Sequence, residues 1–199
     1  NKLRKATGAG MMDCKKALQE TDGNFEKAVE VIRKKGQAVA NKRADREATE
    51  GVVLARVTEE GNQGALVVLN CETDFVAKNE KFVDFAGSIL DVALREHPAT
   101  VEELKRLKLG ARSVEEAVVE QIGVIGEKLA LAHYDFIQAP RVISYIHPGN
   151  KLASMVGFNN DHVNEQVAKD VAMQVAAMNP VAVDKDHVPQ DVIDQDRKS

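Results

Sequence analysis

The feature that most constrains the fold of this chain is a unit of two strands and a helix that occurs twice. In the first copy, apolar runs at 51–57 and 64–70 flank a turn containing Gly61-Asn62, which predicts a β-hairpin. The second run is continuously apolar and so indicates a central strand. A helix follows, with apolar residues spaced by three and four positions, and it ends near His97-Pro98.

The same unit begins again at Arg141. Strands at 141–146 and 151–158 flank the turn His147-Pro148-Gly149-Asn150, and the next helix ends at Asn179-Pro180. The apolar positions of the two helices coincide when the copies are aligned, which predicts a structural duplication. Those of the second helix are Val167, Ala168, Val171, Ala172, Val175 and Ala176.

The two copies differ in the connection between the second strand and the helix. The second copy makes it with 159–162, whereas the first copy needs a longer connection that includes 72–79 and carries Phe75. A Phe in a connecting loop either covers the local core as a lid or is presented to a partner protein. Because the second copy does without this insertion, the fold does not require it, which favours the partner hypothesis.

Residues 1–36 predict a bundle of three short helices separated by two glycine-containing turns. The third helix is expected to begin after an N-cap at Asp22 or Asn24 and to stop at Gly36. Residues 37–50 are charged and have no wide apolar stripe, so they are interpreted as a solvated helical linker. The apolar face of the second helix consists of Met11, Cys14, Ala17 and Leu18.

The chain as a whole is predicted to be α+β, with two related subdomains after the linker. Residues 51–140 form subdomain one and residues 141–199 form subdomain two. Beyond its first helix, subdomain one is expected to contain helices at 100–107 and 113–125 and a strand at 128–138. After Pro180 only a polar tail is expected, so subdomain two is interpreted as incomplete.

Composition excludes several classes of function. With 199 residues, 44% hydrophobic and 29% charged, the chain can bury a core, while its net charge of −4 argues against a general nucleic-acid binder. No apolar run approaches the ~20 residues of a membrane-spanning helix. Two cysteines form no disulfide framework and suit a reducing compartment, so the expected location is the cytoplasm, or the matrix of an organelle.

No motif for covalent chemistry stands out. Gly8-Ala9-Gly10 is not followed by the Lys and Ser/Thr of a phosphate-binding loop, and the five histidines are scattered. We therefore expect no catalytic residue, no metal site and no cofactor of its own, and a protein that is not an enzyme. An alternative is a thiol-dependent enzyme that uses Cys14 or Cys71, which predicts that alkylation abolishes its activity.

Two stretches closely resemble the signature motifs of the elongation factor Ts family. They are the segment from Thr7 to Leu18 (TGAGMMDCKKAL) and the segment from Asn70 to Lys78 (NCETDFVAK). The resemblance extends over the chain to about Pro180. It implies an N-terminal bundle of the ubiquitin-associated type and two related α+β subdomains, in agreement with the duplication.

The resemblance also implies a function. Members of this family are guanine-nucleotide exchange factors that act on elongation factor Tu, with no direct contact to nucleic acid or membrane. It implies that the Phe75 ring enters an apolar crevice of the partner and disturbs the site that holds Mg²⁺ and GDP, and that the helix at 171–178 adds a contact. The residues expected to bind the partner are Thr73, Asp74, Phe75, Val76, Met11, Met12 and His147.

A second function class remains open on the sequence alone. A non-catalytic docking or scaffold protein could bind peptides or ubiquitin-like partners through the N-terminal bundle. Such a protein has no use for the insertion that carries Phe75, which is the feature that separates the two hypotheses. The sequence carries no signal for the oligomeric state.

Overall fold

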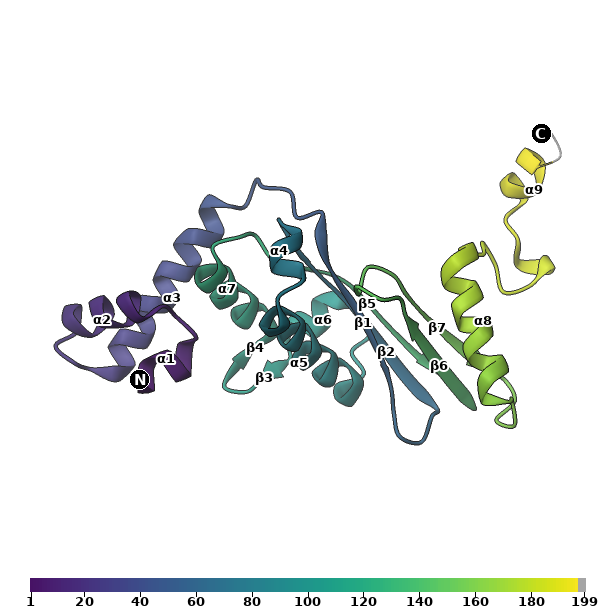
Figure 1. Ribbon diagram of the computed structural model, residues 1–199, viewed down its shortest axis with the longest axis horizontal. Coiled ribbons are helices and arrows are strands. Elements are labelled where there is room, and N and C mark those ends of the chain that lie inside the picture. The colour runs from purple at the N-terminus through teal and green to yellow at the C-terminus, as the bar shows by residue number, and fades with distance from the viewer. Residues whose placement is uncertain (197–199) are drawn as a thin grey trace.

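The computed structural model describes residues 1–196 and is elongated (Figure 1). Three N-terminal helices occupy one end, a three-stranded sheet with its helices occupies the middle, and a second hairpin with a long helix leads to the other end. The strand pairs are antiparallel and the helices lie beside them, so the prediction of an α+β fold is confirmed.

The N-terminal helices form a unit with a small core of its own. Gly8 ends the first helix in the left-handed conformation, with φ 68°. Asn24 caps the third helix, because its side chain accepts a hydrogen bond from the backbone N–H of Lys27 at 3.0 Å. The helices are α1 (Lys2–Thr7), α2 (Met11–Glu20) and α3 (Phe25–Lys42). Their buried core consists of Leu3, Ala9, Cys14, Ala17, Ala28 and Ile32.

The prediction that the third helix stops at Gly36 is wrong, because α3 continues to Lys42. Gly36 is buried against helix α7 (Val114–Ile125), so tertiary packing outweighs the ~1 kcal/mol by which glycine disfavours a helix. Val39 and Ala40 then pack against the main core. The first part of the expected linker is therefore helical, as predicted, but Val39 and Ala40 within it are partly buried.

A buried carboxylate also joins α3 to α7. Glu120 of α7 is only 6% exposed and forms ion pairs with Arg33 of α3 and with Arg112. The Nε–Oε1 distance to Arg33 is 3.3 Å. Because an unpaired charge is costly to bury, loss of either arginine is expected to destabilise the contact between the N-terminal helices and the core.

The central sheet has the order β1-β2-β5, with β2 in the middle as predicted. Alternate residues of β2, including Val67 and Leu69, are fully buried beneath helix α5, which also contacts β1. On β1, Val52 contributes to the same core. The strands are β1 (Glu50–Val57), β2 (Gln63–Cys71) and β5 (Ala130–Gln138), and α5 is Glu80–Glu96.

The remaining predicted helices of this region are present. Ser113 and Glu116 form a reciprocal capping box at the start of α7, and Thr100 caps the helix before it through the Glu103 N–H at 3.1 Å. A pair of two-residue strands connects the two helices. These elements are α6 (Val101–Arg106), β3 (Lys108–Leu109) and β4 (Arg112–Ser113).

The predicted second copy of the unit is also present. Strands β6 (Arg141–Ile146) and β7 (Ala153–Phe158) form an antiparallel hairpin, and α8 (Glu165–Met178) follows. His97 after α5 and Asn179 after α8 both adopt the left-handed conformation, with φ of 48° and 45°. A C-cap residue in the left-handed conformation therefore ends the helix in both copies.

The apolar face predicted for α8 is narrower than expected. Ala168 and Ala172 are fully buried, whereas Val167 and Val171 are 53% and 36% exposed. The two-stranded β6–β7 sheet presents less surface than the three-stranded sheet, so it leaves Val167 and Val171 exposed. In the expected polar tail, the structure has a 3₁₀ turn, Lys185–His187, and helix α9, Gln190–Asp196. None of the helices within residues 1–196 is both long and apolar enough to cross a bilayer.

Candidate functional site

The insertion that carries Phe75 is a single helical turn, α4 (Asp74–Ala77), rather than a loop. It rests on β1, β2 and α5 at the end of the central sheet (Figure 1). Ala77 is buried and Val76 packs against the main core, so this side of the turn is anchored. A four-residue helix has no stability of its own, and its geometry therefore comes from these contacts.

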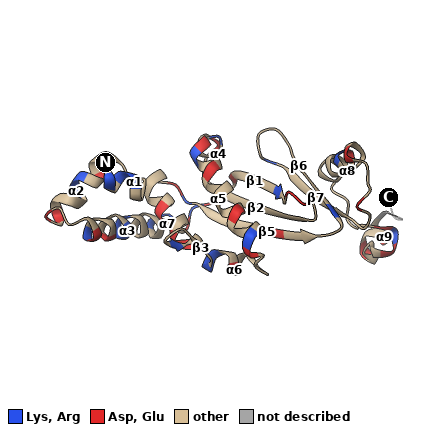
Figure 2. Cartoon of the chain, turned by 90° about the horizontal axis from the view of Figure 1, so that it is seen from below, with Lys and Arg blue, Asp and Glu red and all other residues tan. Residues whose placement is uncertain are grey.

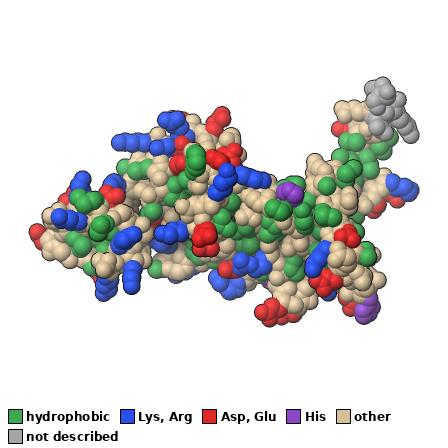
Figure 3. Space-filling view, in the orientation of Figure 1, with side chains coloured by type: hydrophobic (Ala, Val, Ile, Leu, Met, Phe, Trp, Pro, Cys, Tyr) green, Lys and Arg blue, Asp and Glu red, His purple; other side chains and the backbone are tan. Residues whose placement is uncertain are grey.

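Phe75 lies on the opposite side of this turn and is 82% exposed. The hypothesis that it acts as a lid on the local core is therefore wrong. Burial of a Phe side chain contributes about 1.5–3 kcal/mol, which the isolated chain does not gain here. In the space-filling view, hydrophobic surface lies next to charged side chains at the position of α4 (Figure 3).

Asp74 begins the turn and pairs with Lys78 one turn later, with Oδ2 and Nζ 2.6 Å apart. The hydrogen bond from Lys78 lowers the pKa of the Asp74 carboxyl and raises that of the Lys78 ammonium. Both groups are exposed to solvent to a large degree. The exposed aromatic thus lies beside a pair of opposite charges on the surface.

Thr73, also predicted to bind a partner, has a structural role in the free chain. Its hydroxyl accepts a hydrogen bond from the Val76 N–H at 3.4 Å and donates one to Glu127 Oε1 at 2.7 Å. Glu127 Oε2 accepts from the Thr73 N–H at 3.1 Å. Glu127 follows α7 and comes from a distant part of the sequence. Nothing in the sequence assigned a role to Glu127, because carboxylates are abundant and none has diagnostic spacing.

Glu72 holds the other side of the base of α4, by which we mean Glu72 and Thr73, the two residues that lead into this turn. Its carboxylate accepts from the Lys128 backbone N–H at 2.6 Å and from Arg43 Nη1 at 2.8 and 2.9 Å. The Lys128 hydrogen bond is the largest cause of the lowered pKa of Glu72; burial opposes it, and the Arg43 guanidinium adds to the lowering. The contacts bring together the end of α3, the base of α4 and the segment between α7 and β5.

The other predicted partner-binding residues lie on different elements from α4. Met11 and Met12, at the start of α2, are 72% and 61% exposed. Met11 shares the apolar spacing of Cys14 and Ala17, but those two side chains are buried and Met11 is exposed. His147 lies in the β6–β7 turn, where its Nδ1 is 2.8 Å from the Tyr145 hydroxyl.

Comparison with known proteins identifies the family. The family model described as elongation factor TS matches residues 72–199. Relatives carrying the name elongation factor Ts align over 98% of this chain: that of Azobacteroides pseudotrichonymphae genomovar. CFP2 is 51% identical, with 71% of its length covered, and that of Porphyromonas gingivalis strain ATCC 33277 is 53% identical, with 70% covered. The chain belongs to the elongation factor Ts family. The resemblance inferred from the two motifs is confirmed.

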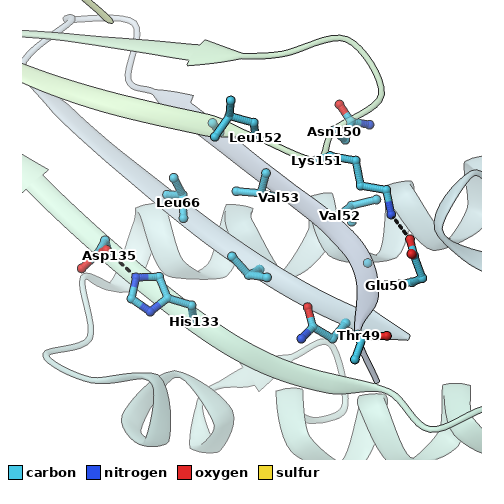
Figure 4. Close-up of a pocket in the computed structure, with 14 residues that line it drawn as sticks. Thr49, Glu50, Val52, Val53, Leu66, His133, Asp135, Asn150, Lys151 and Leu152 are labelled. Carbon is cyan, nitrogen blue, oxygen red and sulfur yellow. Dashed lines mark hydrogen bonds and ion pairs between the residues drawn. The ribbon is translucent and has the colours of Figure 1, made fainter. Parts of the chain in front are cut away.

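This member of the elongation factor Ts family also has a hollow on the open face of the central sheet (Figure 4). It measures about 420 Å³ and lies between the sheet and the β6–β7 turn. Val53 and Leu66 form part of its floor, and His133 Nε2 pairs with Asp135 Oδ2 at 2.6 Å. Its described lining contains no serine or cysteine, and Lys151, which also lines it, pairs with Glu50.

The two thiols of this elongation factor Ts family member are buried. Burial, with a contribution from Glu127, raises the pKa of Cys71 to about 11, and its Sγ–H donates to the Thr73 carbonyl at 3.2 Å. Cys71 is therefore a protonated core side chain at neutral pH, which is the opposite of what a nucleophile requires. Within residues 1–196, no cluster of three or more His, Cys, Asp or Glu side chains is arranged to hold a metal ion.

Proposed function

We propose that this chain promotes release of GDP from elongation factor Tu by inserting Phe75 into an apolar crevice of that protein. Membership of the elongation factor Ts family implies guanine-nucleotide exchange on elongation factor Tu. The insertion of Phe75 is proposed because this side chain is 82% exposed on a turn whose other side is anchored in the core.

The energetics of the exposed ring support this role. The Phe75 ring makes few contacts in the free protein that binding would have to break. Its transfer from water into an apolar crevice of a partner contributes about 2 kcal/mol to binding. Thr73, the N-cap of α4, is held by the hydrogen bonds that it donates to the Glu127 carboxylate, so less conformational entropy is lost on binding than with a flexible loop. Both effects favour a ring that acts as a wedge.

The proposed mechanism converts this binding energy into nucleotide release. Entry of the Phe75 ring displaces a helix and a loop of elongation factor Tu that border its Mg²⁺ and phosphate site, so Mg²⁺ coordination weakens and GDP dissociates. Asp74 lies beside the ring and meets the same surface. By linkage, GDP must weaken the binding of this chain by the same factor by which this chain weakens the binding of GDP.

We propose further contacts that contribute less to the binding free energy than Phe75 does. The exposed thioethers of Met11 and Met12 adapt their shape to a partner surface, and His147 adds a contact from the second hairpin. Thr73 and Val76 contribute mainly by holding α4. Basic and acidic side chains are interspersed over the N-terminal helices and around α4 (Figure 2), which suits a protein surface better than a phosphate backbone.

The direct test is Phe75→Ala, with release of fluorescently labelled GDP from elongation factor Tu as the measurement. We expect release to slow by tenfold or more, equivalent to about 1.4 kcal/mol. The fold is expected to be unchanged, because Phe75 makes little contact with its own core. Val183→Ala, which alters a fully exposed apolar residue far along the chain, is the matched control. An unchanged rate in Phe75→Ala rules out the wedge.

The scaffold hypothesis makes a different prediction about nucleotide. A docking protein that uses only the exposed methionines of α2 binds its partner equally well with and without GDP and Mg²⁺. The exchange mechanism requires excess GDP and Mg²⁺ to displace elongation factor Tu from this chain. Retention measured by pull-down at increasing GDP separates the two, and retention independent of GDP contradicts exchange.

A further inference from the structure

The backbone that leads into α4 is contacted by a residue distant in the sequence. Helix α4 has four residues, fewer than a helix needs to be stable alone. Its N-cap, Thr73, therefore has to be held in its extended conformation, with φ −123° and ψ 153°, by contacts from outside the turn. The side chain of Glu127 provides these contacts.

Glu127 satisfies three donors at the base of α4 with one carboxylate. Oε2 accepts from the backbone N–H of Glu72 at 3.2 Å and of Thr73 at 3.1 Å, and Oε1 accepts from the Thr73 hydroxyl at 2.7 Å. Bonds to two consecutive N–H groups restrain the backbone that leads into the turn. The bond to the hydroxyl orients it so that its oxygen accepts from the Val76 N–H. Ionised acceptors make the stronger class of hydrogen bond.

A second carboxylate extends this arrangement to the N-terminal helices. Glu72 accepts from the Lys128 N–H and from Arg43, which follows α3. The Lys128 ammonium donates to the carbonyls of Ala44 and Arg46 at 2.6 and 2.7 Å. The base of α4 is thus connected on one side to the end of α3 and on the other to the segment after α7.

We propose that Glu127 is a positioning residue for nucleotide exchange, which holds α4 so that Phe75 meets elongation factor Tu in one orientation. The inference rests on the proposed function and deepens it. If the backbone before α4 were free to move, binding of the ring would cost orientational entropy. Less binding energy would then remain to displace the helix and the loop of elongation factor Tu. Glu127 itself is half-buried beneath the turn and acts through Phe75.

A purely structural role for Glu127 is separated from positioning by a double-mutant cycle. The full chain is made with Glu127→Ala, with Phe75→Ala and with both substitutions, and the maximal rate of GDP release from elongation factor Tu is measured at saturation. We expect Glu127→Ala to slow release about tenfold when Phe75 is present and less than twofold when it is absent. General destabilisation slows release equally in both backgrounds, and that result overturns the proposal.

Two further variants keep the test informative if Glu127→Ala folds poorly. Thr73→Val keeps the side-chain shape and removes both hydroxyl hydrogen bonds, so it is expected to show the same dependence on Phe75. Glu127→Gln retains an acceptor for the two backbone N–H groups and is expected to restore most of the rate. A Thr73→Val variant with the wild-type rate overturns the inference.

Matched controls come from helix α6, which uses the same chemistry away from α4. Thr100 caps α6, and Glu103 Oε2 accepts from the Ala99 N–H at 2.6 Å. Thr100→Val and Glu103→Ala are expected to leave GDP release unchanged. If Phe75→Ala alone has no effect, the proposed function fails. If Phe75→Ala slows release and Glu127→Ala does not, only the positioning role fails.

Discussion

Gly36 of α3 and Gly123 of α7 face each other where the two helices cross. A Cβ built on Gly123 would lie 2.6 Å from the Gly36 Cα, closer than carbon atoms approach. A Cβ built on Gly36 would meet the Val119 carbonyl at 3.4 Å, which is an ordinary contact. The crossing therefore depends on the absence of a side chain at one glycine and not at the other.

This asymmetry predicts opposite effects of the same substitution. Gly123→Ala forces the helices apart at a cost of ~1–3 kcal/mol, offset in part by the ~1 kcal/mol gain in helix propensity. Gly36→Ala gains the propensity with little steric penalty, so it is expected to be neutral or stabilising by up to about 1 kcal/mol. Urea unfolding of both variants followed by circular dichroism measures the difference. Equal effects of the two substitutions contradict the packing described for this crossing.

The base of α4 is predicted to loosen in acid. Hydrogen bonds from the Lys128 N–H and Arg43 lower the pKa of Glu72 below its usual value of 4.5, so the ionised form is favoured in the folded protein. Its contribution to stability is therefore fully present above pH 4.5 and is lost as pH falls through the lower pKa of the folded state.

The check is an NMR titration of the Lys128 amide signal, which reports the charge on its acceptor. We expect a midpoint below pH 4.5. Glu72→Gln keeps the side-chain shape, and we expect this variant to lose that titration and to lower the acid dependence of the free energy of unfolding. A variant that retains the full acid dependence shows that Glu72 does not contribute to it.

Cys71 is predicted to resist alkylation in the native protein. Burial raises its pKa to about 11, and its side chain is fully buried in the core. At about pH 8, iodoacetamide is expected to modify Cys71 only after denaturation, because the thiolate is the reactive species. The stabilisation by the neutral thiol is present below the unfolded pKa of 9.0 and is lost as pH rises through about 11.

Mass spectrometry of the native and the urea-unfolded protein after equal exposure to iodoacetamide measures this difference. The unfolded sample is the control for reagent activity. Rapid modification of Cys71 in the native sample, with GDP release lost in step, revives the hypothesis of a thiol-dependent enzyme. Retention of GDP release after exposure agrees with a protein that acts by binding.

The hairpins and the long helices were predictable because their signals are local. The alternation around Val67, the turn at Gly61 and the proline after His97 each act over a few residues, and the structure follows them closely. The exposure of Phe75 was inferred from comparison of the two copies of the unit. That inference required no contact information, since the second copy shows what the fold can omit.

The errors occurred where a distant segment outweighs a local signal. Gly36 is a normal helix terminator by sequence, yet α7 packs against it and the helix continues. Val167 and Val171 have the spacing of a buried face, but the β6–β7 hairpin is too narrow to cover them. The one-turn helix at Asp74 has no clear sequence signal, because its cap depends on a carboxylate 54 residues away.

The amino-acid sequence was sufficient to predict the order of the main strands and helices, the duplication, the family and the exposure of Phe75, because periodicity and motifs are properties of neighbouring residues. It could not establish which side chains hold Phe75 in place. Glu127, Glu72 and Arg43 have no shared spacing, and only folding brings them to the base of α4. Hydrogen bonds act over about 3 Å in space, whatever the separation along the chain, so the orientation of the exposed ring is a property of the tertiary structure.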